Sequence, residues 1–292
     1  MTLWQRLSSA FFALAFLYAG AQRHEIGVQA GMANLVGDIG RTNFILQKPF
    51  REVSTFGLPF YGGVMYKMNF NPYQGVRLNA GYSNIQFSDL RAPEEYRYNR
   101  GREGTNSVYN LDAQFEYNFL PINDEQKRGM ISPYIFGGVG AIMYAARQVT
   151  LDFTGQLFDP GIGLIFPDYP QDYNGIASSK LAHVFTLSVP FGAGLKYKFN
   201  YRWAVFGELK FRYTLTDGID YSKLDDRNLK VVGKVMQIDG TERRLTRDEL
   251  NKIRDPYLAG QQIGNPNSND WTNAVTLGVS YSFGRPPCYC DR

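Results

Sequence analysis

The feature that most constrains this chain is a strict two-residue alternation of apolar and polar side chains. Between Tyr109 and Phe119, odd-numbered positions are apolar or aromatic and even-numbered positions are polar. The segment His183–Phe199 repeats the pattern. A helix would scatter both sets around its circumference, whereas successive side chains of a β-strand point to opposite faces. The alternation therefore predicts β-strands with one apolar face.

Six further segments follow the alternation and bring the predicted strands to eight. These are Glu25–Asp38, Phe60–Phe70, Tyr73–Ile85, Ser132–Tyr144, Trp203–Thr214 and Trp271–Phe283. Strands of about 11 to 14 residues cross a bilayer when they are tilted. The connections alternate between short and long. The long ones are predicted as outer loops: Ile39–Pro59, Gln86–Val108, Ala145–Ala182 and Leu215–Asp270. The pattern predicts an all-β fold, an eight-stranded antiparallel up-and-down transmembrane β-barrel with short periplasmic turns and long extracellular loops.

Composition agrees with a barrel. The chain is 44% hydrophobic and contains 20 Tyr and 21 Phe, yet its mean hydropathy is −0.31. Many aromatic residues with a polar average are typical of barrels, and no segment after residue 25 reads as an apolar spanning helix of about 20 residues. The net charge of +4 is not gathered into a Lys/Arg stripe, so nucleic-acid binding is not indicated.

The amino terminus predicts export. A single basic residue, Arg6, precedes the apolar run Ala10–Tyr18, and Ala19-Gly20-Ala21 forms a small-residue cleavage site. This pattern is typical of a secretory signal peptide. The predicted organisation is a cleaved signal at 1–21, an outer-membrane barrel at 22–283 and a periplasmic tail at 284–292. Both termini of the mature chain are expected in the periplasm.

The two strand faces have different chemistry. Aromatic residues gather at the predicted periplasmic ends, as an interfacial girdle requires: Phe70, Tyr73, Tyr117, Phe119, Tyr134, Tyr197, Phe199, Tyr201, Trp203, Tyr281 and Phe283. The opposite face carries charges of both signs, which include Lys67, Arg77, Asp112, Glu116, Glu208, Lys210 and Arg212. An eight-stranded barrel has an interior that side chains fill. We therefore expect these charges to form a neutralising network that plugs the lumen.

Catalytic and metal motifs are weak in this sequence. The two histidines, His24 and His183, have no Ser, Cys or carboxylate neighbour at the spacing of a triad. Carboxylates near the bases of the outer loops could serve a barrel enzyme: Asp89, Glu94, Glu95, Asp217 and Asp220. Solvated loop carboxylates are the more common explanation. We expect no catalytic residue, cofactor, metal or small-molecule substrate.

The carboxy-terminal tail holds the only two cysteines, Cys288 and Cys290. A bridge between them would close a very small, strained loop. Disulfides persist in the periplasm, so a bridge to a partner protein is the sharper hypothesis, and an unstructured tail without a role is the alternative. The link Leu120–Ile131 is a second candidate contact surface on the periplasmic side.

Several short segments together resemble PorG, the outer-membrane barrel family of type IX secretion systems. They are Glu25-Ile26-Gly27-Val28, Gly37-Asp38-Ile39-Gly40, Asn43-Phe44, Asn71-Pro72, Pro133-Tyr134, Leu195-Lys196-Tyr197, Asn267-Ser268-Asn269-Asp270-Trp271 and Pro287-Cys288-Tyr289-Cys290. The resemblance implies a non-enzymatic barrel that holds a periplasmic ring of the lipoprotein PorK and its partner PorN against the outer membrane. The segments Ala145–Ala182 and Val231–Ile263 are longer than expected for that family.

Two other functions stay open from the sequence. A small porin or ligand-binding barrel would need a lumen free of opposed charges, which the inward set argues against. An outer-membrane barrel enzyme would use the carboxylates at the outer rim. The leading expectation is a monomeric barrel for anchoring and assembly, with outer-membrane lipid and the PorK/PorN ring as its partners.

Overall fold

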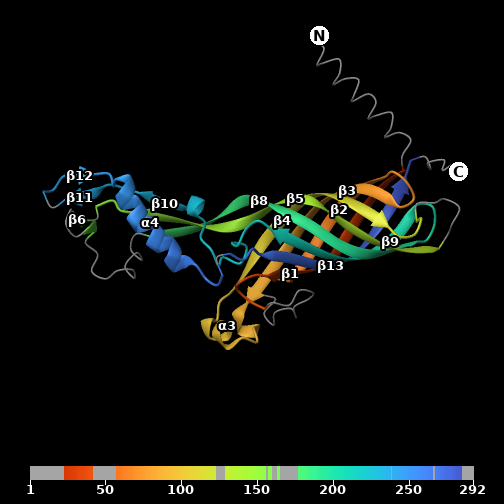
Figure 1. The fold of residues 1–292 in the computed structure, drawn as a ribbon, viewed down its shortest axis with the longest axis horizontal. Helices are drawn as coiled ribbons and strands as arrows, with labels where there is room; N and C mark the ends of the chain where they lie inside the picture. The colour runs from red at the N-terminus through yellow and green to blue at the C-terminus, as the bar shows by residue number, and fades with distance from the viewer. Residues whose placement is uncertain are drawn as a thin grey trace, which may run out of the picture.

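The computed structural model describes residues 23–41, 57–122, 129–155, 157–159, 163–164, 177–237, 239–265 and 267–284. Eight long antiparallel strands within these ranges form a closed ring (Figure 1). They are β1 (Arg23–Val36), β2 (Phe60–Asn69), β3 (Gln74–Ser88), β4 (Glu103–Asn118), β5 (Met130–Asp152), β8 (Ala177–Lys198), β9 (Trp203–Thr214) and β13 (Trp271–Phe283). Each strand pairs with its neighbours in this order, and β1 pairs with β13 to close the ring. The predicted fold class is confirmed.

The ring is built for a bilayer. Large apolar side chains point outward on every strand, with Val139 67% and Leu277 73% exposed, whereas Lys67 and Glu116 are fully buried inside. Because the ring is closed, the backbone N–H and C=O groups at the strand edges bond to each other, and the hydrocarbon of a bilayer could not have bonded them. The barrel therefore spans the outer membrane, as predicted. No helix within the described ranges is long and apolar enough to cross a membrane.

Tight turns join the strands at the periplasmic end. Asn71 Oδ1 accepts hydrogen bonds from the backbone N–H groups of Tyr73 and Gln74, each at 2.8 Å. Asn200 Oδ1 does the same for Arg202 and Trp203, at 2.9 and 3.0 Å. Asparagine favours such turns because its short side chain mimics a backbone acceptor. Both short links are thus stabilised by the same asparagine-centred turn.

Two strands extend far beyond the barrel, which corrects the prediction that Ala145–Ala182 is a loop throughout. β5 has 23 residues and β8 has 22, and they remain paired out to Leu151 and Ala177. On β5 the buried positions change from even numbers, ending at Ala146, to odd numbers, starting at Val149. A single alternation therefore does not describe the whole strand. The alternation predicted from the sequence ends at Tyr144, whereas β5 continues to Asp152.

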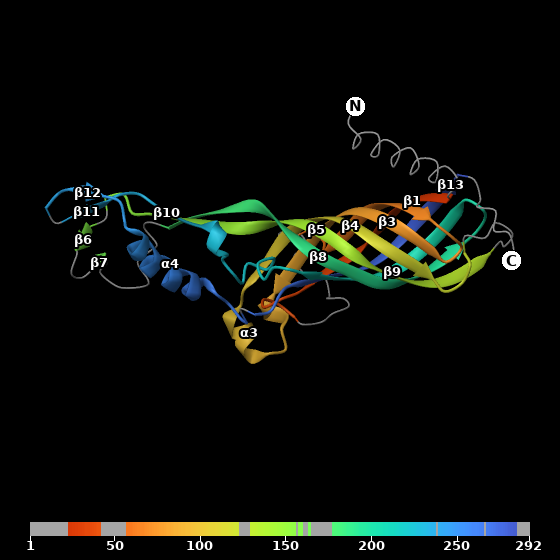
Figure 2. The same ribbon diagram turned by 45° about the horizontal axis from the view of Figure 1, so that its top comes forward.

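The extension carries a small outer domain, which we call the arm (Figures 1 and 2). β10 (Leu229–Val232) adds to β5 in parallel, and α4 (Arg247–Gln261) begins at a capping box between Thr246 and Glu249. The remaining elements are β6 (Leu157–Asp159), β7 (Gly163–Leu164), β11 (Val235–Gln237), β12 (Glu242–Arg243) and η3 (Asp226–Asn228). The arm core consists of Val149, Leu151, Phe153, Leu224, Leu229, Val235 and Ile253. The predicted loop Leu215–Asp270 is thus largely folded.

A second folded insertion lies between β3 and β4. It contains η1 (Asp89–Arg91) and α3 (Glu95–Arg100), and α3 ends at Gly101 in the left-handed conformation with a φ of 62°. Glycine adopts this backbone conformation without strain. Its last-turn residues Arg97 and Arg100 reach the segment that follows β1. The insertion is thus hydrogen-bonded to the segment that follows β1, at the outer end of the barrel.

Candidate functional site

The lower lumen holds a dense ion-pair network. Lys67 Nζ lies 2.5 Å from Glu116 Oε1, and Arg77 contacts both Glu116 and Glu208. Lys210 Nζ lies 3.1 Å from Glu208 Oε2. Every member except Lys210 is no more than about 1% exposed at its side chain, and Lys210 is 12% exposed. Buried charges are tolerated when they are paired and hydrogen-bonded in this way.

A separate pair closes the upper lumen. Arg212 binds Asp112 through two parallel hydrogen bonds, Nη1 to Oδ1 at 2.5 Å and Nη2 to Oδ2 at 2.7 Å. Asn110 and Ser188 supply further bonds to the two partners. The planar guanidinium matches a carboxylate in this forked geometry. The structure thus places all seven charges of the predicted lumen set inside the barrel, divided between two levels.

Sequence reasoning missed three members of the lower network. Lys196 Nζ bonds Glu25 Oε1 at 2.9 Å and lies 3.5 Å from Glu116. Tyr134 donates to Glu208 Oε1 at 2.7 Å. Glu25 and Lys196 share the inward phase of their strands, so extending the alternation across each strand would have found them.

The placement of Tyr134 in the periplasmic aromatic girdle is wrong. Its side chain is 1% exposed and points into the lumen. The reason is steric complementarity, because Gly194 across the ladder leaves the space that the Tyr134 ring occupies. Gly192 does the same for Phe136. A sequence count of aromatics near strand ends cannot detect such pairing of small and large residues.

The filled lumen leaves little free volume. The cavity beside Tyr61, Asn110, Lys210 and Arg212 has a volume of about 20 Å³. That volume holds about one water molecule. Within the described residues the barrel interior is therefore a packed polar core rather than a passage.

The outer mouth has a different construction, centred on the segment Gly37–Gly40. Arg97 Nη1 donates to the Gly40 carbonyl at 2.7 Å, and Arg100 Nη2 donates to the Asp38 carbonyl at 2.7 Å. Asp89 accepts from the Gly40 N–H at 2.8 Å and pairs with Arg100. Gly40 has a φ of 99°, which side-chain-bearing residues rarely adopt. We call this segment with its bound side chains the mouth clasp.

Four aspartates converge beneath the mouth clasp: Asp38, Asp217, Asp220 and Asp270. Backbone N–H groups hold three of them, from Asn265 to Asp38 at 3.0 Å, from Ile39 to Asp220 at 2.8 Å and from Ile219 to Asp270 at 2.8 Å. Burial raises the pKa of all four groups. The pKa of Asp217 rises to about 7 because burial is reinforced by the charges of Asp38 and Asp220.

The other sequence candidates lie apart from this cluster or outside the described residues. Asp89 is committed to Arg100, and Glu94 and Glu95 flank the start of α3. His183 lies on the exposed outer half of β8. Cys288 and Cys290 fall outside the described residues, as does the signal segment. Among the residues that are described, no group of three or more His, Cys, Asp or Glu is arranged to hold a metal ion.

Solved structures of small outer-membrane barrels are similar to this chain at a distance. The attachment invasion locus protein Ail of Yersinia pestis is 12% identical, with 90% of this chain and 99% of that chain covered and a TM-score of 0.39. A major outer membrane protein from Thermus thermophilus is also 12% identical, with 90% and 100% covered and a TM-score of 0.41. Neisserial surface protein A is 10% identical, with 89% and 97% covered and a TM-score of 0.39. Likenesses this remote carry no argument about function.

Sequence comparison places the chain in a family. No curated protein sequence matches it. The family profile described as "Domain of unknown function (DUF6089)" matches residues 5–167, which is more than half of the 292 residues. The matched range contains β1 to β5, the lumen residues from Glu25 to Glu116 and the mouth-clasp segment Gly37–Gly40. The chain therefore belongs to the DUF6089 family.

Proposed function

We propose that this barrel is the outer-membrane component of a type IX secretion system that anchors or helps assemble the periplasmic ring of PorK and PorN. The observation that carries the proposal is the packed lumen, in which Lys67, Arg77, Glu116 and Glu208 are mutually paired. A barrel without a passage acts through its surfaces and ends. The resemblance to PorG then indicates which surface and which partner.

Two segments of the resemblance meet in space, which supports treating them as one signature. Asp38 of Gly37–Gly40 and Asp270 of Asn267–Trp271 lie in the same buried aspartate cluster. Their separation in sequence exceeds two hundred residues, so their proximity is a property of the fold. Short segments that resemble a family individually are weak evidence, whereas segments that build one structural unit are stronger.

We propose that the docking surface is on the periplasmic side. The short turns Asn71–Pro72 and Asn200–Arg202 lie there, and we propose that the link Leu120–Ile131 and the cysteine-bearing tail 284–292 contribute to this surface. We propose that Cys288 or Cys290 forms a mixed disulfide with the lipoprotein subunit. The thiolate of the tail cysteine would attack the partner's sulfur in an existing disulfide. The old S–S bond would break, and its other sulfur would leave as a thiolate with the electron pair.

A non-reducing gel of outer membranes tests the proposal directly. Wild type, Cys288→Ser, Cys290→Ser and the double variant are compared with and without thiol reductant. We expect a reductant-sensitive band of higher mass that disappears in the double variant and contains PorK. Secretion measured in the same strains reports whether the covalent link is needed.

Two results would oppose the proposal at different levels. If no such band forms and secretion survives the double change, the disulfide is wrong and docking must rest on noncovalent contacts. If deletion of the barrel leaves the ring attached and secretion intact, the anchoring role itself fails. Reconstitution in a planar bilayer addresses the porin alternative, because a packed lumen is expected to give no steady current.

A further inference from the structure

An apolar groove of about 700 Å³ lies on the outer wall of the barrel. It crosses β1, β8, β9 and β13, and its walls include Val28, Leu195, Val205, Leu277 and Val279. Gly207 forms part of its floor and points outward, where a Cβ atom would meet the tip of the Leu277 side chain at 3.2 Å. Ala30 of β1 is the small residue on the other side of Leu277, because β13 lies between β1 and β9. The hollow exists because small residues interrupt a wall of large apolar ones.

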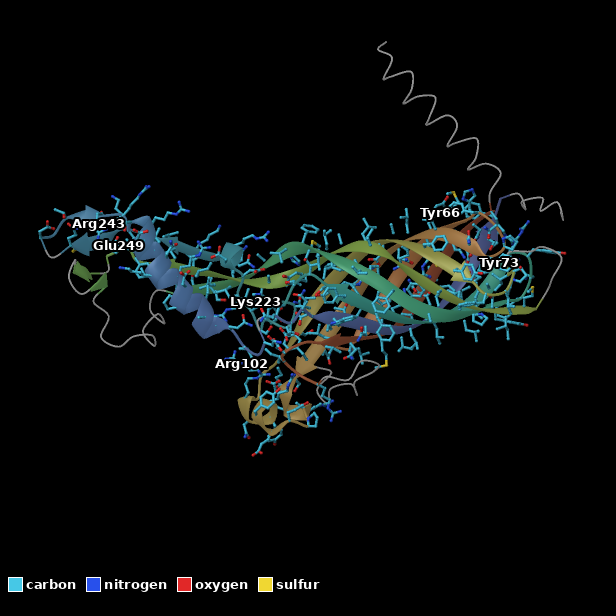
Figure 3. All side chains as sticks on the ribbon, viewed as in Figure 1. Tyr66, Tyr73, Arg102, Lys223, Arg243 and Glu249 are labelled. Atoms are coloured by element: carbon cyan, nitrogen blue, oxygen red, sulfur yellow. The ribbon has the colours of Figure 1, made fainter. Side chains whose placement is uncertain are left out.

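A second, polar pocket of about 490 Å³ lies at the periplasmic rim below this groove. Arg23 and Arg202 line it, together with Tyr201, Tyr281 and Ser282. Arg202 lies in the turn between β8 and β9 and is exposed. Tyrosine and tryptophan mark the headgroup level of a membrane, and Figure 3 shows Tyr66 and Tyr73 at the same end of the barrel. Arg202 presents an exposed guanidinium at this level, which suits an anion, whereas Arg23 is only 4% exposed.

The two hollows follow one strand. The groove contacts Leu277, Gly278 and Val279 of β13, and the rim pocket contacts Tyr281, Ser282 and Phe283 of the same strand. From Leu277 to Tyr281 the strand advances by about 13 Å at about 3.3 Å per residue. Half of a bilayer's hydrocarbon core measures about 15 Å. The distance along β13 from the groove to the rim pocket therefore matches the length of one lipid from the middle of the membrane to its headgroup.

We propose that the groove and the rim pocket together bind one anionic glycerophospholipid of the periplasmic leaflet. One acyl chain lies in the groove over Gly207, and the phosphate lies against Arg202. Charge complementarity selects the phosphate, and the apolar walls select the chain. Basic pockets at the membrane surface recognise lipid headgroups in this way. The inference stands on the barrel alone and does not depend on the secretion role.

Native mass spectrometry of the purified, delipidated full chain tests the site. The probes are dioleoylphosphatidylglycerol and, separately, dioleoylglycerol, which has the same chains and no phosphate. We expect one phosphatidylglycerol per barrel to be retained, and Gly207→Leu to weaken its binding about tenfold by filling the groove. Arg202→Gln is expected to weaken phosphatidylglycerol binding about threefold to tenfold and to leave dioleoylglycerol unchanged.

Matched variants separate a specific site from ordinary lipid contact. Ala30→Leu fills the same groove from β1 and should reproduce the loss if Gly207→Leu does not fold. Ala113→Leu adds the same volume on the exposed face of β4, away from the groove, and should retain the lipid. Equal losses in Ala30→Leu and Ala113→Leu would overturn the proposal. Equal retention of the two probes by the wild type would also overturn it.

Discussion

The lumen and the outer mouth use buried charge in opposite ways. In the lumen, carboxylates face cations, so that Glu116 is shared by Lys67, Arg77 and Lys196. In the aspartate cluster beneath the mouth clasp, carboxylates face carboxylates, and backbone N–H groups rather than cations hold Asp220 and Asp270. Of the arginines nearby, Arg97 donates to the Gly40 carbonyl, whereas Arg100 donates to the Asp38 carbonyl and forms an ion pair with Asp89.

Because of this difference, the stability of the lumen ion pairs should depend little on pH, whereas that of the aspartate cluster should depend on protonation. Opposed charges stay paired over a wide range of pH, whereas crowded carboxylates must share protons to stay together. Of the two regions, the mouth is therefore the one whose stability should respond to physiological pH. The following predictions test the contrast, beginning with the largest effect.

Removal of one cation from the lumen should be severe. We expect Lys67→Met to lower the free energy of unfolding by about 3–5 kcal/mol, because it leaves Glu116 with an uncompensated share of buried charge. Lys234→Met is the matched control, since the pair of Lys234 with Glu242 on the arm is 55% exposed at both side chains. Exposed pairs contribute less than about 1 kcal/mol. Urea unfolding in lipid vesicles measures both. Similar losses would show that burial of the lumen pair is unimportant.

A double-mutant cycle should reveal strong coupling between Asp112 and Arg212. We expect each single change, Asp112→Asn or Arg212→Met, to cost about 2–4 kcal/mol, and the double variant to cost less than their sum by about 1–3 kcal/mol. The physical reason is that each single change strands the partner's buried charge. Unfolding free energies of the four proteins give the coupling. Simple additivity would mean that the forked pair is not formed.

The mouth should lose stability as pH rises. The pKa of Asp217 is raised from 3.8 to about 7, so the folded state binds the proton more tightly than the unfolded state. The stabilisation is then complete below about pH 4 and is lost as pH rises through about 7. Asp217→Asn mimics the protonated form, so we expect it to stabilise the protein by about 1–2 kcal/mol at pH 8 and to have little effect at pH 4.

Hydrogen exchange locates this effect. The Ile39 and Ile219 amides donate to Asp220 and Asp270. Their protection should fall between pH 5 and pH 8 in the wild type and less steeply in Asp217→Asn. Protection that does not depend on pH in the wild type would contradict a proton-held mouth.

The smallest effect is expected on the arm. Glu249 accepts from Arg243 at 2.7 Å and from the Thr246 N–H at 2.7 Å, and Figure 3 labels Arg243 and Glu249 side by side on the arm. These bonds lower the pKa of Glu249 to about 2. Their contribution is therefore present above about pH 4.5 and is lost as pH falls through about 2. We expect Glu249→Gln to cost less than about 1 kcal/mol, measured by limited proteolysis of the arm at pH 7. A loss as large as that of Lys67→Met would refute the ranking by burial.

The barrel could be predicted from the sequence because the alternation that defines each strand lies within a few consecutive residues. Alternation along Tyr109–Phe119 identifies both faces of one strand, and the phase of Asp112 or Glu116 follows from it. The outward positions of β8, from Leu187 to Tyr197, follow from the same rule. The inward position of Tyr134 did not follow, because it depends on a glycine on another strand.

The mouth could not be predicted for a related reason. Its contacts join Ile39 to Asp220 and Asp38 to Asn265, residues that are 181 and 227 positions apart. Nothing in the local sequence of Asp217 or Asp220 distinguishes them from solvated loop carboxylates. The arm was missed because its buried residues change phase at Val149 and because its helix lies within a segment of mixed polarity.

The length of the β5–β8 ribbon has a practical consequence for cell-surface labelling. Eleven residues of β8, Ala177 to Leu187, precede the first residue that pairs with β9. At about 3.3 Å per residue they reach about 35 Å beyond that point. Gly240 lies between β11 and β12, with open space around its Cβ position. Figure 1 shows these two strands at the far tip of the arm. We expect an antibody to bind an epitope inserted there on intact cells, and the insertion would leave the barrel strands unchanged.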